Sequence, residues 1–189
     1  LGGNGARGAL RTHAASDLHH LVDRCFSGDF RGGARARIAR AAVAHRRLAR
    51  ARRGQPRRSA VERHAELALG GHFLRVEGRS VYPRQEANPK GDVHGEIDLW
   101  SYDRTRQTLI LRQFDTLGFV GTYALDKASS SAGKWVLLGE SLENVPKGWK
   151  ARYTFTLIAP NEYHEMLELD ADGKGFQPYV TNRFLRIEK

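Results

Sequence analysis

Cysteine and long apolar runs are almost absent from the chain. Cys25 is the only cysteine, so neither an intrachain disulfide nor a Cys-x-x-Cys pair for zinc or redox chemistry can form. No stretch of eighteen apolar residues occurs, and we therefore predict no membrane span. The segment "LGGNGARGAL" (1–10) lacks the apolar centre of a signal peptide. These features favour a reducing compartment, and we expect a cytoplasmic protein.

Familiar catalytic motifs are lacking as well. The chain has no Gly-x-Ser-x-Gly nucleophile elbow and no Walker loop, and no Lys-Ser or Lys-Thr pair follows "GGNGARG" (2–8). "HEMLE" (164–168) begins like the zinc motif His-Glu-x-x-His, but it ends in Glu168 and lies in a predicted strand. We therefore predict no catalytic set and no metal site, and we expect a non-catalytic protein.

Lysine is missing from the first third of the chain, where the positive charge is concentrated. Residues 1–70 hold fifteen Arg and five Asp or Glu, whereas residues 71–189 hold sixteen basic and sixteen acidic residues. The net charge of +10 therefore belongs to the first third, in which Phe26 and Phe30 are the only aromatic residues. We predict an Arg/Ala-rich, non-globular segment over 1–58 and a globular domain over 59–189.

The Arg/Ala-rich segment is either a nucleic-acid-binding region or a solvated segment without a binding role. Arginine contacts to phosphates would bind nucleic acid in a salt-dependent way. No aromatic residue for base stacking occurs between Arg31 and Arg63, however, and a charge run without a docking motif is usually solvated. Residues 33–53 have high helix propensity, but their apolar stripe is narrow and weak. Nucleic acid is therefore the less favoured partner.

From residue 60 onward, apolar and polar residues alternate in short segments separated by Gly-, Pro- and Asn-rich turns. This pattern predicts antiparallel strands joined by short links, with no room for crossover helices. The expected fold is all-β, an antiparallel up-and-down barrel or sandwich of about nine strands. The predicted strands are 60–69, 72–82, 93–102, 107–115, 118–126, 134–143, 149–159, 162–170 and 176–188.

The stretch "EANPKGDVHGEIDLWSYDRTRQTLILRQFDTLGFVGTYALD" (86–126) resembles a bacterial family of small β-barrels. That family is similar in build to the fatty-acid-binding-protein and nitrobindin type of calycin barrel, and the resemblance runs from about Gly54 to Lys189. It implies an antiparallel up-and-down, calycin- or lipocalin-like β-barrel of about nine to ten strands around an interior pocket for a small apolar or amphipathic molecule. Nitrobindin-like relatives hold haem, which makes a haem-binding barrel an alternative.

The Gly-x-Trp-x-Gly pattern that commonly opens the first strand of such barrels is missing. "HRRLARARRGQP" (45–56) stands in its place. One hypothesis is a frameshift: with GC-rich codons for Leu48 to Arg52, reading one nucleotide later gives Trp-Arg-Gly-Arg. The same shift over His45 to Arg47 adds Thr-Gly-Gly in front, and the coding DNA would test this. Without its first strand, a barrel has a gap with unpaired edges, which favours a homodimer.

The candidate ligand-binding residues are polar or aromatic side chains within apolar strands. An inward Arg112 would need a carboxylate partner, from Glu140 or from a ligand, because burying an unpaired charge is costly. We expect Arg112, Tyr123 and Arg183 to hold an anionic head group, unless they belong to an ordinary outward polar face. His164 is a candidate haem ligand. The residues expected to line the core or the pocket are Trp100, Phe114, Tyr153 and Phe155.

These observations predict a protein that binds a small apolar or amphipathic ligand inside a β-barrel without transforming it. The haem barrel and the nucleic-acid binder are the two alternatives. Alternating side chains after residue 60 should enclose an apolar space, and a completely packed interior would contradict the prediction.

Overall fold

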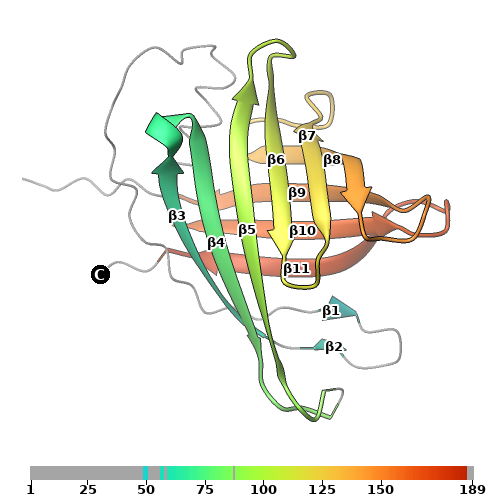
Figure 1. Ribbon diagram of the computed structural model, residues 1–189. Helices are drawn as coiled ribbons and strands as arrows, with labels where there is room; N and C mark the ends of the chain where they lie inside the picture. The colour runs from blue at the N-terminus through green and yellow to red at the C-terminus, as the bar shows by residue number, and fades with distance from the viewer. Residues whose placement is uncertain (1–48, 51–55, 58, 87, 187–189) are drawn as a thin grey trace, which may run out of the picture.

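The fold is one antiparallel sheet of nine strands, in which each strand is hydrogen-bonded to the next along the chain (Figure 1). The computed structural model describes residues 49–50, 56–57, 59–86 and 88–186. Two short strands, β1 (Ala49–Arg50) and β2 (Pro56–Arg57), form a separate sheet. The nine strands of the main sheet are β3 (Ala60–Ala68), β4 (Phe73–Tyr82), β5 (Asp92–Asp103), β6 (Thr108–Asp115), β7 (Val120–Leu125), β8 (Lys134–Glu143), β9 (Lys150–Ala159), β10 (Glu162–Asp170) and β11 (Gln177–Leu185).

The predicted all-β, antiparallel up-and-down fold is confirmed, and each of the nine predicted strands is present. The only helical element among the described residues is the single 3₁₀ turn η1 (Leu69–Gly71), which joins β3 to β4. Its backbone has positive φ at Leu69 (50°), Gly70 (70°) and Gly71 (85°). The paired glycines therefore take the conformation that a tight hairpin connection requires.

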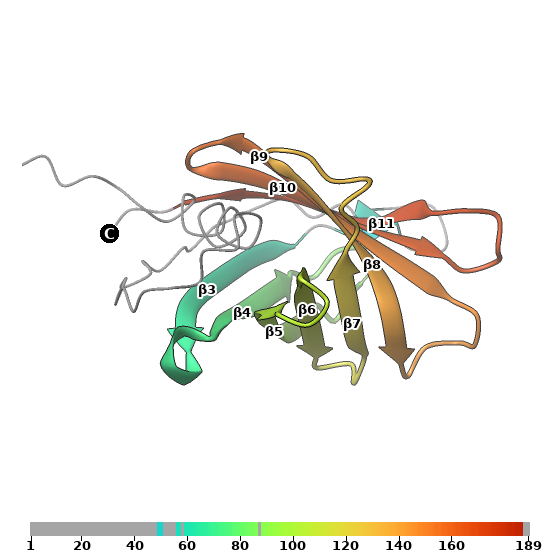
Figure 2. The ribbon, with the colours of Figure 1, turned by 90° about the horizontal axis from the view of Figure 1, so that it is seen from above.

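The sheet curls into a half-barrel and leaves one side open. Seen from above, β9, β10 and β11 form the wall that faces β3 to β6 (Figure 2). The two edges of the sheet are β3 and β11, and among the described strands no ladder joins them. The expected barrel is thus present with an open edge. An open edge is expected if the first strand of the barrel is missing. The frameshift itself stays a hypothesis.

Two of the register shifts in the main sheet add to its curvature. The register between β7 and β8 shifts at Thr122/Tyr123, so that Glu140 of β8 is the additional residue. The register between β10 and β11 shifts at Leu167/Glu168. Because a bulge increases the local twist of a strand, both irregularities help the sheet to curl.

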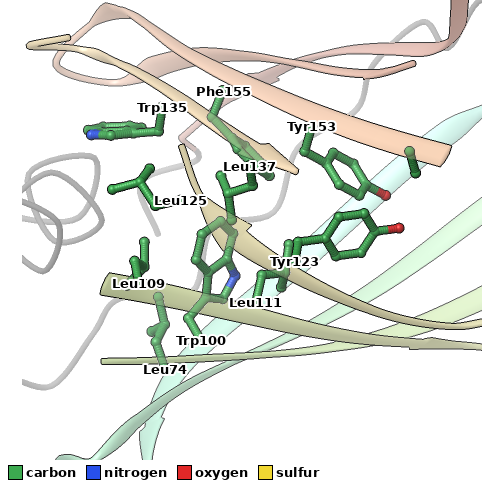
Figure 3. Close-up of a cluster of buried hydrophobic side chains, with 11 residues drawn as sticks. Leu74, Trp100, Leu109, Leu111, Tyr123, Leu125, Trp135, Leu137, Tyr153 and Phe155 are labelled. Atoms are coloured by element: carbon green, nitrogen blue, oxygen red, sulfur yellow. The ribbon is translucent and has the colours of Figure 1, made fainter. Parts of the chain in front are cut away.

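One end of the interior is a packed hydrophobic core (Figure 3). Trp100 lies edge-on to Phe155, with ring centroids 5.2 Å apart, and Leu111 and Leu137 are completely buried. These side chains come from alternate positions of successive strands, which all point to the same face of the sheet. The buried members of this core are Leu74, Trp100, Leu109, Leu111, Tyr123, Leu125, Trp135, Leu137, Ala151, Tyr153 and Phe155.

Side chains, rather than backbone pairing, bridge the open edge. Val61 of β3 and Phe184 of β11 form a small second core, although their strands are not paired. Tyr163 of β10 stacks on Phe184 with ring centroids 4.8 Å apart. The guanidinium carbon of Arg63 lies 4.5 Å from the centroid of the same Phe184 ring. This combination of stacking and cation–π contact holds β3 against β10 and β11.

The Arg/Ala-rich segment lies almost entirely outside the described residues. The predictions of a non-globular region and of nucleic-acid binding concern this segment and therefore also lie outside them. Ala49 and Arg50, the only described residues of the stretch 33–53, form a strand rather than a helix. Among the described residues, no helix is long and apolar enough to cross a membrane.

Candidate ligand-binding cavity

A cavity of about 280 Å³ occupies the end of the interior opposite the Trp100 core. Its walls come from the ends of β4, β6 and β8 and the beginnings of β5, β7 and β9, which meet at the same end of an up-and-down sheet. The β6–β7 connection contributes Leu117 and Phe119, and the β8–β9 connection contributes Val145, Pro146 and Trp149. The volume is at the lower limit of ordinary small-molecule pockets, roughly 300–1,000 Å³, so it suits a small ligand.

A larger hollow of about 840 Å³ lies along β3 to β6, but it is an open surface feature. Its apolar members are Val93, Ile97 and Phe114, which are partly exposed and point to the outer face of the sheet. Small-molecule sites usually bury most of the ligand surface. We therefore place the candidate site in the smaller, more enclosed cavity.

Two neighbouring tyrosines mark the boundary between the core and the cavity. The rings of Tyr123 and Tyr153 meet edge to face, with centroids 5.1 Å apart, and both hydroxyls point away from the tryptophan and leucine cluster (Figure 3). The Tyr153 hydroxyl donates to Oε1 of Gln113 at 2.9 Å. Burial raises the pKa of both phenols above the ordinary value, so they remain neutral hydrogen-bonding groups.

The Tyr123 hydroxyl has no hydrogen-bond partner among the described residues, although Tyr123 is only 4% exposed. It lines the cavity, so a ligand there would find an uncommitted donor and acceptor. Buried polar groups are nearly always hydrogen-bonded, to protein or to water. The hydroxyl is therefore available to a ligand or to water in the cavity.

The ionisable groups that line the cavity are mainly acidic. Glu96 points inward from β5, and Asp115 ends β6 with its Oδ1 accepting the backbone N–H groups of Leu117 and Phe119. His94 also lines the cavity, with Nε2 lying 2.7 Å from Oδ2 of Asp92. No Lys or Arg is found among the described lining residues.

A buried ion-pair network lies behind Glu96. Arg63 Nε donates to Glu96 Oε1 at 2.7 Å, while the two terminal nitrogens of Arg63 donate to the carboxylate of Glu165. Asn182 Nδ2 also donates to Glu165, at 2.9 Å. Burial disfavours the guanidinium charge, but Glu165 and Glu96 outweigh that effect and hold the pKa of Arg63 well above its ordinary value. The network therefore contains one cation and two carboxylates.

A third acid, Asp98, follows Glu96 on the inward face of β5. Asp98 is 3% exposed, and its Oδ1 has no hydrogen-bond partner among the described residues. Burial, reinforced by the nearby charge of Glu96 and opposed by Arg63, raises the pKa of Asp98 well above its ordinary value. The aspartate is thus favoured as a neutral acid, because a further negative charge beside Glu96 and Glu165 would be strongly destabilised.

Four of the residues selected from the sequence lie inside the half-barrel. Tyr123 and Tyr153 line the cavity, as expected of pocket residues. Trp100 belongs to the packed core at the other end, together with Phe155. Which of them contacts a ligand stays a prediction.

The other selected residues lie on the outer face. Arg112 donates to Oγ of Ser101 at the surface, and Phe114 is 40% exposed. Glu140, suggested as one partner of an inward Arg112, is paired with Arg106 instead. Arg183 is bound by Glu162 on the exterior. The cavity lining includes none of these residues, and their part in ligand binding stays a prediction.

His164, the candidate haem ligand, also points outward. Its side chain is 46% exposed and lies 3.3 Å from Glu162, while the neighbouring Tyr163 and Glu165 face the interior. The haem alternative therefore has no axial ligand at the predicted position. Among the described residues, no three His, Cys, Asp or Glu side chains are grouped as a metal site would require.

The sequence reasoning missed Arg63, although a signal was present. Val61, Arg63 and Ala65 occupy alternate positions of one strand, so the arginine shares a face with two apolar residues. Glu96 and Asp98 show the same inward pattern two strands later. No protein-family model matches the chain, and no curated protein is significantly similar to it.

Proposed function

We propose that this chain is a calycin-like carrier or sensor that binds a small apolar or amphipathic molecule in the cavity beyond Tyr123 and Tyr153. The observation that carries the proposal is the division of the interior. One end is completely filled by side chains, whereas the other retains a lined space of about 280 Å³. Protein interiors normally leave few voids larger than a water molecule, so a space of this size is a binding feature rather than a packing defect.

The lining fits such a ligand. Leu142, Val145, Pro146 and Trp149 offer apolar contact, and Tyr123 and Gln113 offer polar groups that orient a ligand. Convergent polar groups in a mostly apolar pocket are the usual composition of small-molecule sites. On this composition we propose binding without chemistry as the function of the site.

Cavity filling tests this proposal. Phenethyl alcohol is a suitable probe, because it is small, uncharged and amphipathic, and its binding would be followed by Trp149 fluorescence and by calorimetry. Ala151→Leu introduces three carbons at a buried wall position of the cavity. We expect the full-length variant to lose measurable binding, and we expect Ala128→Leu, at an exposed position of the β7–β8 connection, to bind like the wild type.

Two results would contradict the proposal. One is that the wild-type chain does not bind this probe and retains no co-purified small molecule in native mass spectrometry. The other is equal binding by wild type and a folded Ala151→Leu variant, which would place the ligand elsewhere.

A further inference from the structure

We infer that the ligand carries a positive charge, and that the cavity selects a protonated amine attached to a small apolar or aromatic body. This inference rests on the proposed function, since it names the chemical class that the same cavity accepts. It depends on the identity and the bonding of the groups that surround the space.

The first observation is the sign of the lining charges. Glu96 and Asp115 line the cavity, and its described lining residues include no Lys or Arg. The nearest guanidinium, that of Arg63, lies behind Glu96 and is already bound by two carboxylates. A carboxylate ligand would therefore approach fixed negative charges without a free cation to bind it, and burying it there would be costly.

The second observation is that acceptors remain available at the cavity wall. Both Arg63 nitrogens that contact Glu96 approach the same oxygen, Oε1, at 2.7 and 2.6 Å. Among the described residues, none donates to Oε2 of Glu96 or to the hydroxyl of Tyr123. An ammonium group has three donors and no acceptor, so it satisfies these uncommitted oxygens, whereas a neutral apolar group leaves them unpaired.

The third observation is the aromatic character of the wall. Tyr82, Tyr123, Tyr153 and Trp149 all line the same space. The face of an aromatic ring attracts a cation, and the attraction is strongest where water is excluded. Aromatic rings and a carboxylate together form the usual recognition chemistry for a small organic cation.

Gly78 shows how the Glu96 side chain reaches its position. A Cβ atom built on Gly78 would collide with the carboxylate and the Cγ of Glu96. The glycine on β4 therefore leaves the space into which the glutamate of the paired strand folds, between Arg63 and the cavity. An alternating strand without this glycine could not hold the carboxylate there.

Three probes of similar shape test the inference: phenethylamine, phenethyl alcohol and phenylacetate, which carry a cation, no charge and an anion. Each is titrated at neutral pH against the full-length protein by calorimetry. We expect phenethylamine to bind at least about tenfold more tightly than phenethyl alcohol, a preference that weakens with added salt, and we expect phenylacetate not to bind.

Glu96→Gln then identifies the responsible group. This substitution keeps the shape and removes the charge, so the amine preference should fall to near unity while the alcohol still binds. Glu66→Gln is the matched control, because Glu66 is likewise bound by an arginine, Arg75, but on the outer face. We expect it to retain the preference.

The outcomes separate the two proposals. If the alcohol binds in the cavity but phenylacetate binds as well as or better than the amine, the charge inference is wrong and the proposed function stands. A folded Glu96→Gln variant with an unchanged amine preference would also overturn it. If none of the three probes binds to the wild-type chain, the charge inference is wrong, and the proposed function fails as well if native mass spectrometry shows no co-purified small molecule. The wild-type comparison remains decisive even where Glu96→Gln does not fold.

Discussion

The two ends of the half-barrel interior are built from the same strands but have opposite characters. At one end, Trp100, Leu109, Leu125 and Trp135 fill the space between the walls. At the other, Glu96, Tyr123 and Tyr153 surround a cavity. The strands β4, β5 and β6 thus contribute apolar residues at the core end and polar ones at the cavity end. Residues that stabilise the fold and residues that line the cavity therefore lie at opposite ends of the strands. Substitutions at the packed end should lower the stability, and substitutions at the cavity end should change ligand binding.

The largest expected effect comes from the packed end. Trp100→Ala removes a buried aromatic side chain and leaves a void, which should lower the free energy of unfolding by about 3–5 kcal/mol. Urea unfolding followed by circular dichroism measures this loss. Because Trp100 does not line the cavity, the affinity for phenethyl alcohol should stay within about twofold of the wild type. A folded variant that no longer binds the probe would show that the two ends are not independent.

The next effect concerns the buried ion-pair network. Arg63→Met leaves Glu96 and Glu165 without their cation, and such a loss typically costs about 3 kcal/mol or more. Arg75→Met, at an exposed pair with Glu66 on the outer face, is the matched control and should cost less than about 1 kcal/mol. If Arg63→Met and Arg75→Met lowered the free energy of unfolding in urea equally, the interior network would not hold β3 against the opposite wall.

The strands were predictable from the sequence because local signals determine them. Alternation and turn residues such as Gly70 and Gly71 need only neighbours along the chain, and the antiparallel order follows from the short links. The inward and outward faces of β6 were harder to predict, because Leu109, Ile110 and Leu111 are all apolar. Both an inward and an outward Arg112 were therefore considered, and the structure has Leu111 and Gln113 as the inward residues.

The ion-pair network could not be found from local pattern. Arg63 meets partners 33 and 102 positions away, and only the curl of the sheet brings β3 against β10. The cavity depends in the same way on the curvature that the two bulges introduce. Sequence alternation defines which residues share a face, but it does not define which distant faces meet.

A smaller effect distinguishes two tyrosines at the boundary between the ends. Tyr153→Phe removes the donor to Gln113, which should cost about 1 kcal/mol in urea unfolding. Tyr123→Phe removes a hydroxyl that has no partner among the described residues, so its cost should be lower. Phenethylamine binding should show the opposite order, because Tyr123→Phe should weaken it more than Tyr153→Phe does. The same order in both measurements would contradict the assignment of the Tyr123 hydroxyl to the ligand.

The smallest effect is a dependence of stability on pH that Asp98 introduces. Its pKa in the folded protein is raised, first by burial and then by the charge of Glu96, so the folded state binds its proton more tightly than the unfolded state does. The resulting stabilisation is complete below the ordinary aspartate pKa and is lost as the pH rises through the raised value. Asp98→Asn, which is neutral at every pH, should therefore flatten the decline of the urea midpoint between mildly acidic and alkaline pH. Asp172→Asn, in the exposed β10–β11 turn, should leave that decline unchanged, because Lys174 lowers the pKa of Asp172 instead. Parallel declines of wild type and Asp98→Asn would contradict the tighter binding of the Asp98 proton in the folded state.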